Sequence, residues 1–167
     1  MNAAQELWLR QARSDDEVFV HLRRSGTAHC HLLHYLQMAT EKLSKAYLWR
    51  SGNPPPRTHT GFVRFLRALV DRRFELSRIA TVLGFRRRAD LDNLVRDLGT
   101  LAYSLQNLAP AEAQNGPNPE YPWPHEAPVH CPVDHAFVIW NELANTGRGR
   151  RLMQFIERAI VNFERYG

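Results

Sequence analysis

Residues 89–108 read ADLDNLVRDLGTLAYSLQNL, and this stretch decides the fold class. Its leucines recur at alternating spacings of three and four residues, at positions 91, 94, 98, 101, 105 and 108. Such a repeat is typical of a helix that packs along one apolar face, like the seam of a coiled coil. Asp90 and Asp92 lie near its start, where the helix dipole favours negative charge. We therefore expect a long helix over about residues 89–108.

The same periodicity continues on both sides of this stretch. A helix is expected between Thr27, a candidate cap, and the breaking sequence Gly52 to Pro56, with a buried face at positions 32, 36, 39, 43 and 46. The first helix is expected from about residue 4 to Gly26, with a second start or a kink at the capping-box pattern Ser14–Glu17. A further helix is expected to begin at Thr60, and a short helical turn is expected over 79–83. Two more helices are expected to begin near Ala136 and Leu152, with a basic turn over 147–151 between them.

Together these patterns predict an all-α, up-and-down bundle of four to five long helices. A long loop over residues 109–133 precedes the last two helices and holds seven of the ten prolines. The chain has 167 residues and no internal repeat, which predicts a single domain over 1–167.

Composition excludes several classes of protein. No run approaches the roughly 18 apolar residues of a membrane helix, and the first residues lack a secretory core. The two cysteines, Cys30 and Cys131, cannot form a disulfide framework, so we expect a cytoplasmic protein. A formal net charge of +5 favours anionic partners, although arginine supplies all basic residues except Lys42 and Lys45.

Those two lysines lie in the most distinctive segment of the chain. Residues 35–48, YLQMATEKLSKAYL, place Ala39, Glu41-Lys42 and Lys45-Ala46 on one helix. A Gly-Pro loop, Thr58-His59 and a leucine-rich helix follow, and Tyr121-Pro122 comes before the last helices. In this order the motifs resemble those of HEPN (higher eukaryote and prokaryote nucleotide-binding) domains.

The resemblance implies a helical, commonly dimeric domain of a toxin–antitoxin or defence module, often with a minimal nucleotidyltransferase as partner. It implies binding of a nucleotide or RNA, for which Lys42, Lys45, Arg57 and His59 are the candidate contacts. The lysines have a second interpretation, because Glu41 and Lys45 are spaced for a surface ion pair within one helix.

Members of the family that cleave RNA carry an Arg, four to six residues, and then a His near their last long helix. No histidine follows Arg148 in this chain, so we expect a non-catalytic member. The same spacing between Arg24 and His29 leaves a metal-independent endoribonuclease toxin as one alternative function. A protein-interaction or dimerisation module is the other.

No cofactor or metal site is predicted, since a glycine-rich phosphate loop is missing and no histidine or cysteine spacing matches a standard zinc finger. His125, His130, Cys131 and His135 have the residue types for zinc but not the spacing, and His29, His31 and His34 are interpreted as half-buried packing residues.

Tyr121 and Trp123 either stack on a base or, as we favour, pin the loop onto the bundle. Arginine clusters at 72–73, 86–88 and 148–151 would form an RNA-binding stripe only if they converge.

Overall fold

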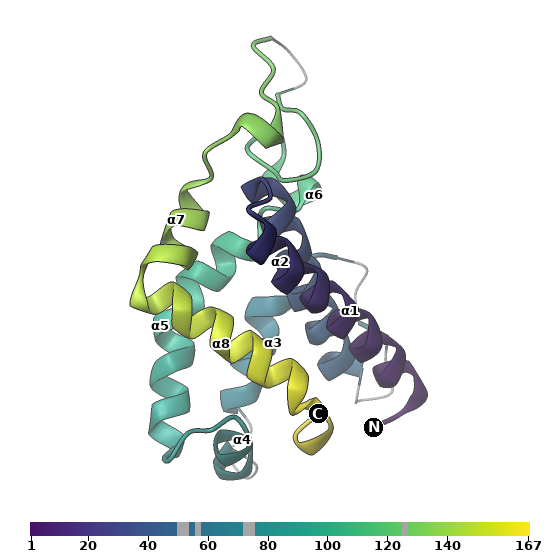
Figure 1. Cartoon of the computed structure of the whole chain (residues 1–167). Coiled ribbons are helices and arrows are strands. Elements are labelled where there is room, and N and C mark those ends of the chain that lie inside the picture. Colours follow the sequence, from purple (N-terminus) through teal and green to yellow (C-terminus); the bar gives the residue numbers. More distant parts are fainter. Residues whose placement is uncertain (50–53, 56–57, 72–75, 125–126) are drawn as a thin grey trace.

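The computed structural model describes residues 1–49, 54–55, 58–71, 76–124 and 127–167, and within them it confirms the all-α bundle (Figure 1). The long helices are α1 (Ala3–Ser25), α2 (His29–Leu48), α3 (Gly61–Asp71), α5 (Arg88–Gln106) and α8 (Gly147–Val161). Shorter elements are α4 (Leu76–Val82), α6 (Pro110–Ala113), α7 (Val138–Asn145) and the 3-10 turns η2 (Pro132–Asp134) and η3 (Phe163–Arg165). None of the helices in these ranges is long and apolar enough to cross a membrane.

The first helix is continuous from Ala3 to Ser25, so the second start expected at Ser14–Glu17 is wrong, and the alternative of a kink there stays a prediction. Its capping box is formed instead by Asn2 and Gln5, whose side chains bond reciprocally to the backbone N–H groups of the other residue at 2.9 Å. The buried face of α1 continues from Ala12 to Phe19 without a break. Packing of this face therefore outweighs the local capping signal at Ser14.

The central helix of the bundle is α2, which lies antiparallel to α1. The five positions of its expected apolar face, 32, 36, 39, 43 and 46, are all at most 3% exposed. Gln37, Thr40, Glu41 and Ser44 are buried as well, because α1 covers one side of α2 and α3 covers another. Thr27 does not cap α2: its hydroxyl lies 2.8 Å from the Ser25 hydroxyl, and Ala28 occupies the capping position.

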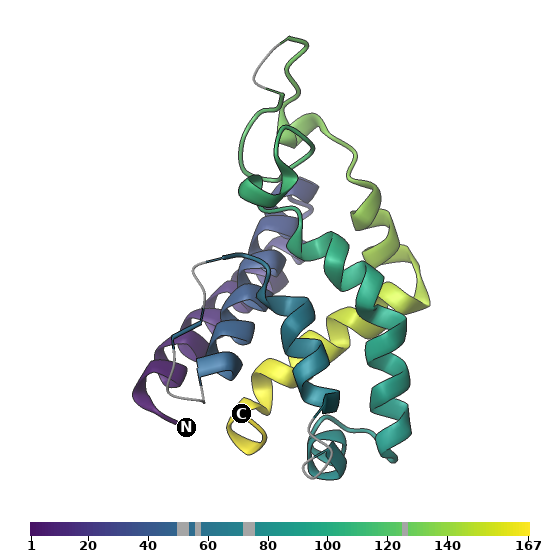
Figure 2. The ribbon, with the colours of Figure 1, turned by 180° about the vertical axis from the view of Figure 1, so that it is seen from behind.

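The leucine repeat that predicted α5 forms its buried face. Leucines 91, 98, 101 and 105 are buried, and Leu94 packs half-buried against the same core; Leu108, beyond the end of α5, is buried as well. Seen from behind, α5 and α3 lie side by side (Figure 2). The side chain of Gln106 accepts a 3.1 Å hydrogen bond from the backbone N–H of Val63, so the C-terminal end of α5 meets the start of α3.

The junction of α7 and α8 differs from the sequence expectation. Residues 147–151, expected as a turn, are the first turns of α8, and Thr146 caps them by accepting a 2.9 Å hydrogen bond from the Gly149 N–H. Gly149 makes this tight corner feasible, because a Cβ there would overlap main-chain atoms of Glu142 and Leu143.

The described part of loop 109–133 extends beyond one end of the bundle, at the top of Figure 1. Trp123 is only 5% exposed, and its ring packs against those of His135 and Phe137. The expectation that the loop is pinned is therefore confirmed for Trp123. It is wrong for Tyr121, which is 60% exposed.

Candidate functional site

A buried carboxylate on α2 organises the residues that the sequence singled out. Glu41 is 5% exposed, and each of its oxygens has a basic partner. Oε2 lies 2.6 Å from Nδ1 of His59, and Oε1 accepts a hydrogen bond from the Lys45 ammonium. The Lys45 Nζ also lies 5.0 Å from the centre of the Trp8 ring on α1, within the range of a cation–π contact. Glu41 thus holds His59 and Lys45 together.

The start of α3 brings His59 to this carboxylate. Gly61, the first residue of α3, lies so close to α2 that a Cβ would stand 3.1 Å from the Cβ of the fully buried Ser44. This contact fixes the preceding Thr58-His59-Thr60 segment beside Glu41. The small residues Gly61 and Ser44 therefore set the distance between the two helices at the site.

A cavity of about 70 Å³ lies beside Lys45 at this point. Its lining includes the hydroxyl-bearing Thr58 and Thr60, the first residue of α3 and the exposed guanidinium-bearing Arg64. Ammonium, guanidinium and hydroxyl groups are donors that bind phosphate oxygens. The arrangement can therefore hold one anionic group at the surface.

The structure separates Lys42 from this cavity. Its Nζ lies 3.0 Å from Oδ2 of Asp15 on α1, and the two side chains are 16% and 10% exposed. The pair joins α1 to α2, so Lys42 is a packing residue and the prediction that it contacts a ligand has no support from its position. The expected Glu41–Lys45 ion pair is confirmed, but it is largely buried rather than on the surface. Arg57 lies outside the described residues.

The candidate catalytic residues Arg24 and His29 are both exposed at the turn between α1 and α2. Among the described contacts, the structure records neither a hydrogen bond nor an ion pair between them. The His29 ring instead lies 5.3 Å from the ring of Trp140. The pair therefore remains a prediction, without a geometry that favours it.

No group of three or more metal-ligating side chains occurs within the described part of the chain, and His125 lies outside it. Both cysteines are free: Cys30 is buried and Cys131 is exposed. His130 and His135 have ring contacts with Trp123. His34 is half-buried and lies 3.4 Å from Glu120, as expected for a packing residue, whereas His29 and His31 are exposed, so half-burial is wrong for these two.

Two of the three arginine clusters are partly paired with acidic side chains. Arg148 pairs with Glu142 on α7, and Arg151 pairs with Asp97 on α5, so part of the third cluster is neutralised by neighbouring helices. Arg87 in the second cluster pairs with Asp90 at 2.8 Å. The pair at 72–73 lies outside the described residues.

Sequence reasoning missed a second hollow, a groove between α3 and α5. Its volume is about 490 Å³; Leu66 and Val95 lie in it, Arg67 and Arg96 flank it, and Tyr103 stands beside it, 58% exposed. Arg64 and Arg67 are one turn apart on α3, which could have been noticed as a basic pair on one helical face.

Asp16 on α1 is the described residue whose pKa departs most from its ordinary value. Burial, together with the negative charges of Glu157 and Glu17, raises the pKa of the Asp16 carboxyl from 3.8 to about 6. The folded chain therefore binds this proton more tightly than the unfolded chain does. The free energy of unfolding consequently falls as the pH rises through this window, and the penalty persists at neutral pH.

Asp16→Asn is expected to remove that penalty. The free energy of unfolding at neutral pH should rise by about 1 kcal/mol, after allowance for solvent screening of a partly exposed group. The decrease of the unfolding free energy as the pH rises from about 3.8 to about 6, the two pKa values of Asp16, should become shallower. Urea denaturation of dilute protein at a series of pH values measures both effects, with Asp134→Asn at an exposed position as the control. An unchanged pH profile would contradict the assignment to Asp16.

Comparisons of this chain with protein-family models, with curated proteins and with solved structures each find no match.

Proposed function

We propose that this chain is a HEPN-like helical domain that binds a nucleotide or RNA through phosphate groups. In this proposal it is non-catalytic, cytoplasmic and homodimeric, and it works with a partner protein, such as a minimal nucleotidyltransferase, in a toxin–antitoxin or defence module. The cavity beside Lys45 carries the binding part of the proposal, because cationic and hydroxyl-bearing side chains line it together. The sequence resemblance alone supports the biological setting.

The neighbouring groove favours RNA over an isolated phosphate. A phosphate at Lys45 and Arg64 would leave the next nucleotide beside Arg67, where Tyr103 offers an exposed aromatic ring. Stacking of a base on such a ring contributes about 1–3 kcal/mol and tolerates any sequence. The net charge of +5 adds long-range attraction for the same ligand.

Arg64→Glu is the test of this site, because Arg64 is exposed and its replacement should leave the fold intact. We expect binding of a fluorescein-labelled oligouridylate, measured by anisotropy, to weaken by about tenfold or more, since a charged phosphate contact is replaced by repulsion. The dependence of binding on salt should also become less steep.

Arg88→Glu provides a matched control with the same change of charge. Arg88 begins α5, whereas the C-terminal end of α5 meets the start of α3, so the two arginines lie at opposite ends of the α3–α5 pair. We expect the control to retain most of the affinity. Equal losses in the two variants would indicate diffuse electrostatic attraction, and no loss in either would overturn the site.

The Glu41–His59 contact favours endoribonuclease activity as a second candidate function, at a place other than Arg24 and His29. A carboxylate beside Nδ1 favours the proton on that nitrogen and leaves Nε2 as an acceptor, which is the state of a general base. The His59 side chain is 39% exposed. Labelled RNA incubated with the protein in chelator distinguishes the functions: intact RNA supports binding alone, and cleavage abolished by His59→Ala supports the enzyme.

A further inference from the structure

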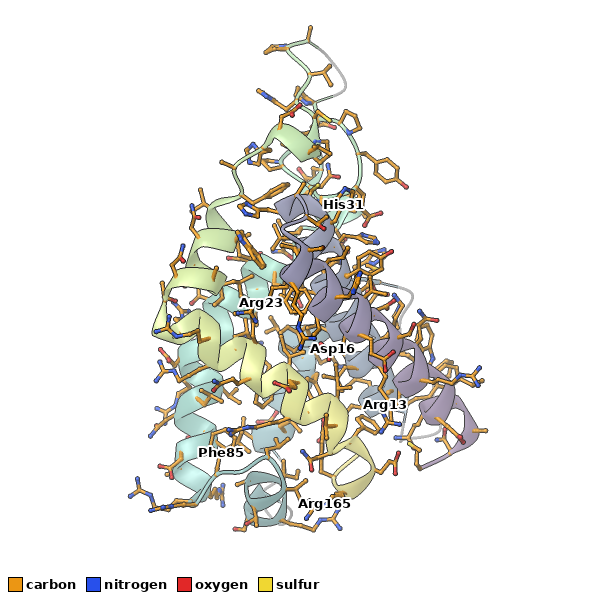
Figure 3. The ribbon with its side chains drawn as sticks, viewed as in Figure 1. Arg13, Asp16, Arg23, His31, Phe85 and Arg165 are labelled. Atoms are coloured by element: carbon orange, nitrogen blue, oxygen red, sulfur yellow. The ribbon has the colours of Figure 1, made fainter. Side chains whose placement is uncertain are left out.

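The face formed by α1 and α8 carries a pattern of charge that the proposed binding site does not use. The two helices run antiparallel: Arg13 pairs at 3.0 Å with Glu164, just beyond the end of α8, whereas Arg23, later in α1, lines a groove with Arg150, near the start of α8. Between them lies a shallow groove of about 190 Å³. In Figure 3, Arg13, Asp16 and Arg23 follow one another along the side of α1 that faces α8.

Like charges face one another across this groove. Asp16 and Glu157 line it together, and after burial, the larger cause, their repulsion contributes to the raised pKa of Asp16. Arg23 and Arg150 line it as well, further along in the antiparallel register. Within the described residues, no ion pair involves any of these four side chains. The groove therefore holds an acidic pair and a basic pair, and no side chain in the described part of the chain neutralises either.

The spacing of the two pairs is the same on both helices. Asp16 and Arg23 are seven residues apart on α1, and Arg150 and Glu157 are seven residues apart on α8. Seven residues make about two turns, or roughly 10 Å along a helix. Val20 and Met153 lie between the pairs, and Val20 is 38% exposed. The surface thus has an apolar centre with negative charge on one side and positive charge on the other.

Such a surface is complementary to itself. A two-fold axis that crosses α1 and α8 near Val20 and Met153 reverses the direction of the helices in the second copy. It therefore places each basic pair over an acidic pair, Arg23 over Asp16 of the second copy and Arg150 over Glu157 of the second copy. A two-fold interface requires this arrangement, in which one patch meets the same patch.

We propose that the α1–α8 face is the interface of a homodimer in which the basic pair of each copy neutralises the acidic pair of the other. This interface deepens the homodimer part of the proposed function and does not depend on RNA binding. A second copy fits better than an unrelated partner, because the equal number and equal spacing of the opposite charges are what self-association needs. The cavity beside Lys45 involves α2 and α3, so both copies keep it accessible.

Two charge-reversal variants test the interface. Arg23→Glu with Arg150→Glu makes the groove wholly acidic, and Asp16→Lys with Glu157→Lys makes it wholly basic. We expect the wild-type protein to have the mass of a dimer by light scattering on a sizing column, and each variant to have the mass of a monomer. The dissociation constant of the dimer should rise by at least about tenfold, because like charges now face one another.

Mixing the two variants gives the decisive result. An acidic groove and a basic groove complement one another, so the mixture should form a heterodimer although each variant alone does not. Retention of the helical circular dichroism signal shows that each variant is folded. If the basic double variant does not fold, the single variant Glu157→Lys, at an exposed position, replaces it. We expect this variant alone to self-associate more weakly than the wild type, and to associate when it is mixed with the acidic variant.

The remaining outcomes overturn the interface in distinguishable ways. A wild-type monomer would reject the homodimer altogether, whereas variants that remain dimeric would place the interface on another face. Failure of the mixture to associate would reject charge complementarity. Loss of oligouridylate binding in the acidic variant, with an unchanged mass, would assign the arginines to RNA instead. Unchanged RNA binding in the monomeric variants would leave the proposed function intact.

Discussion

Gly149→Ala is expected to destabilise the protein by about 3 kcal/mol or more, although alanine is normally the better residue in a helix. A Cβ at position 149 would overlap the carbonyl oxygen of Glu142 and main-chain atoms of Leu143. Backbone atoms cannot rotate away as a side chain would, so α7 and α8 would have to separate. Only Thr146 connects the two helices, and the separation would disturb its cap on Gly149 as well.

Gly99→Ala is the control for this prediction. Gly99 lies inside α5, and a Cβ there meets nothing within 4 Å. The same substitution should therefore raise the free energy of unfolding by about 0.5–1 kcal/mol, which is the intrinsic preference of a helix for alanine. Thermal and urea unfolding of the two variants measures the contrast. A Gly149→Ala protein as stable as the wild type would show that α7 and α8 do not approach this closely.

Lys42→Met is expected to cost about 3 kcal/mol of unfolding free energy. The substitution retains an apolar stem of similar length but removes the charge that lies 3.0 Å from Asp15. The Asp15 side chain is 10% exposed. Once the lysine charge is removed, the polar contact that the described residues still give this carboxylate is a 3.1 Å hydrogen bond from the Gln11 side chain. A nearly buried carboxylate without its cation is among the more destabilising changes in a protein.

Two comparisons distinguish this effect from a general loss of charge. Arg96→Met breaks an ion pair with Asp92 whose side chains are 70% and 43% exposed, and it should cost less than about 0.5 kcal/mol. Replacing Asp15 by Asn as well as Lys42 by Met should recover part of the stability, because no unpaired charge then remains. Urea denaturation of the single and double variants gives the coupling energy. Additive losses would show that the two residues do not interact.

Periodicity predicted the elements of this fold well because it records burial directly. The leucines of residues 89–108 predicted α5, and positions 32 to 46 predicted the inner face of α2. Boundary signals were less reliable where packing competed with them. Ser14 has the form of a cap but lies within α1, and the glycines at 147 and 149 suggested a turn where α8 begins.

The candidate site shows the same division. The sequence drew attention to Lys45 and His59, and the structure places both on Glu41. It also grouped Lys42 with Lys45, since they are three residues apart on one helix. Which neighbouring helix each one meets depends on the packing of α1 and α3 around α2, and the sequence pattern does not contain that information.

The sequence by itself determined an all-α bundle, its long helices, and a net positive charge, because apolar spacing and composition are local properties of the chain. Only the tertiary structure decided which charges meet. It paired Lys42 with Asp15, joined His59 to Glu41, and brought Asp16 beside Glu157. These contacts join residues on different helices, and their energies depend on distance and burial, which are fixed only when the helices pack.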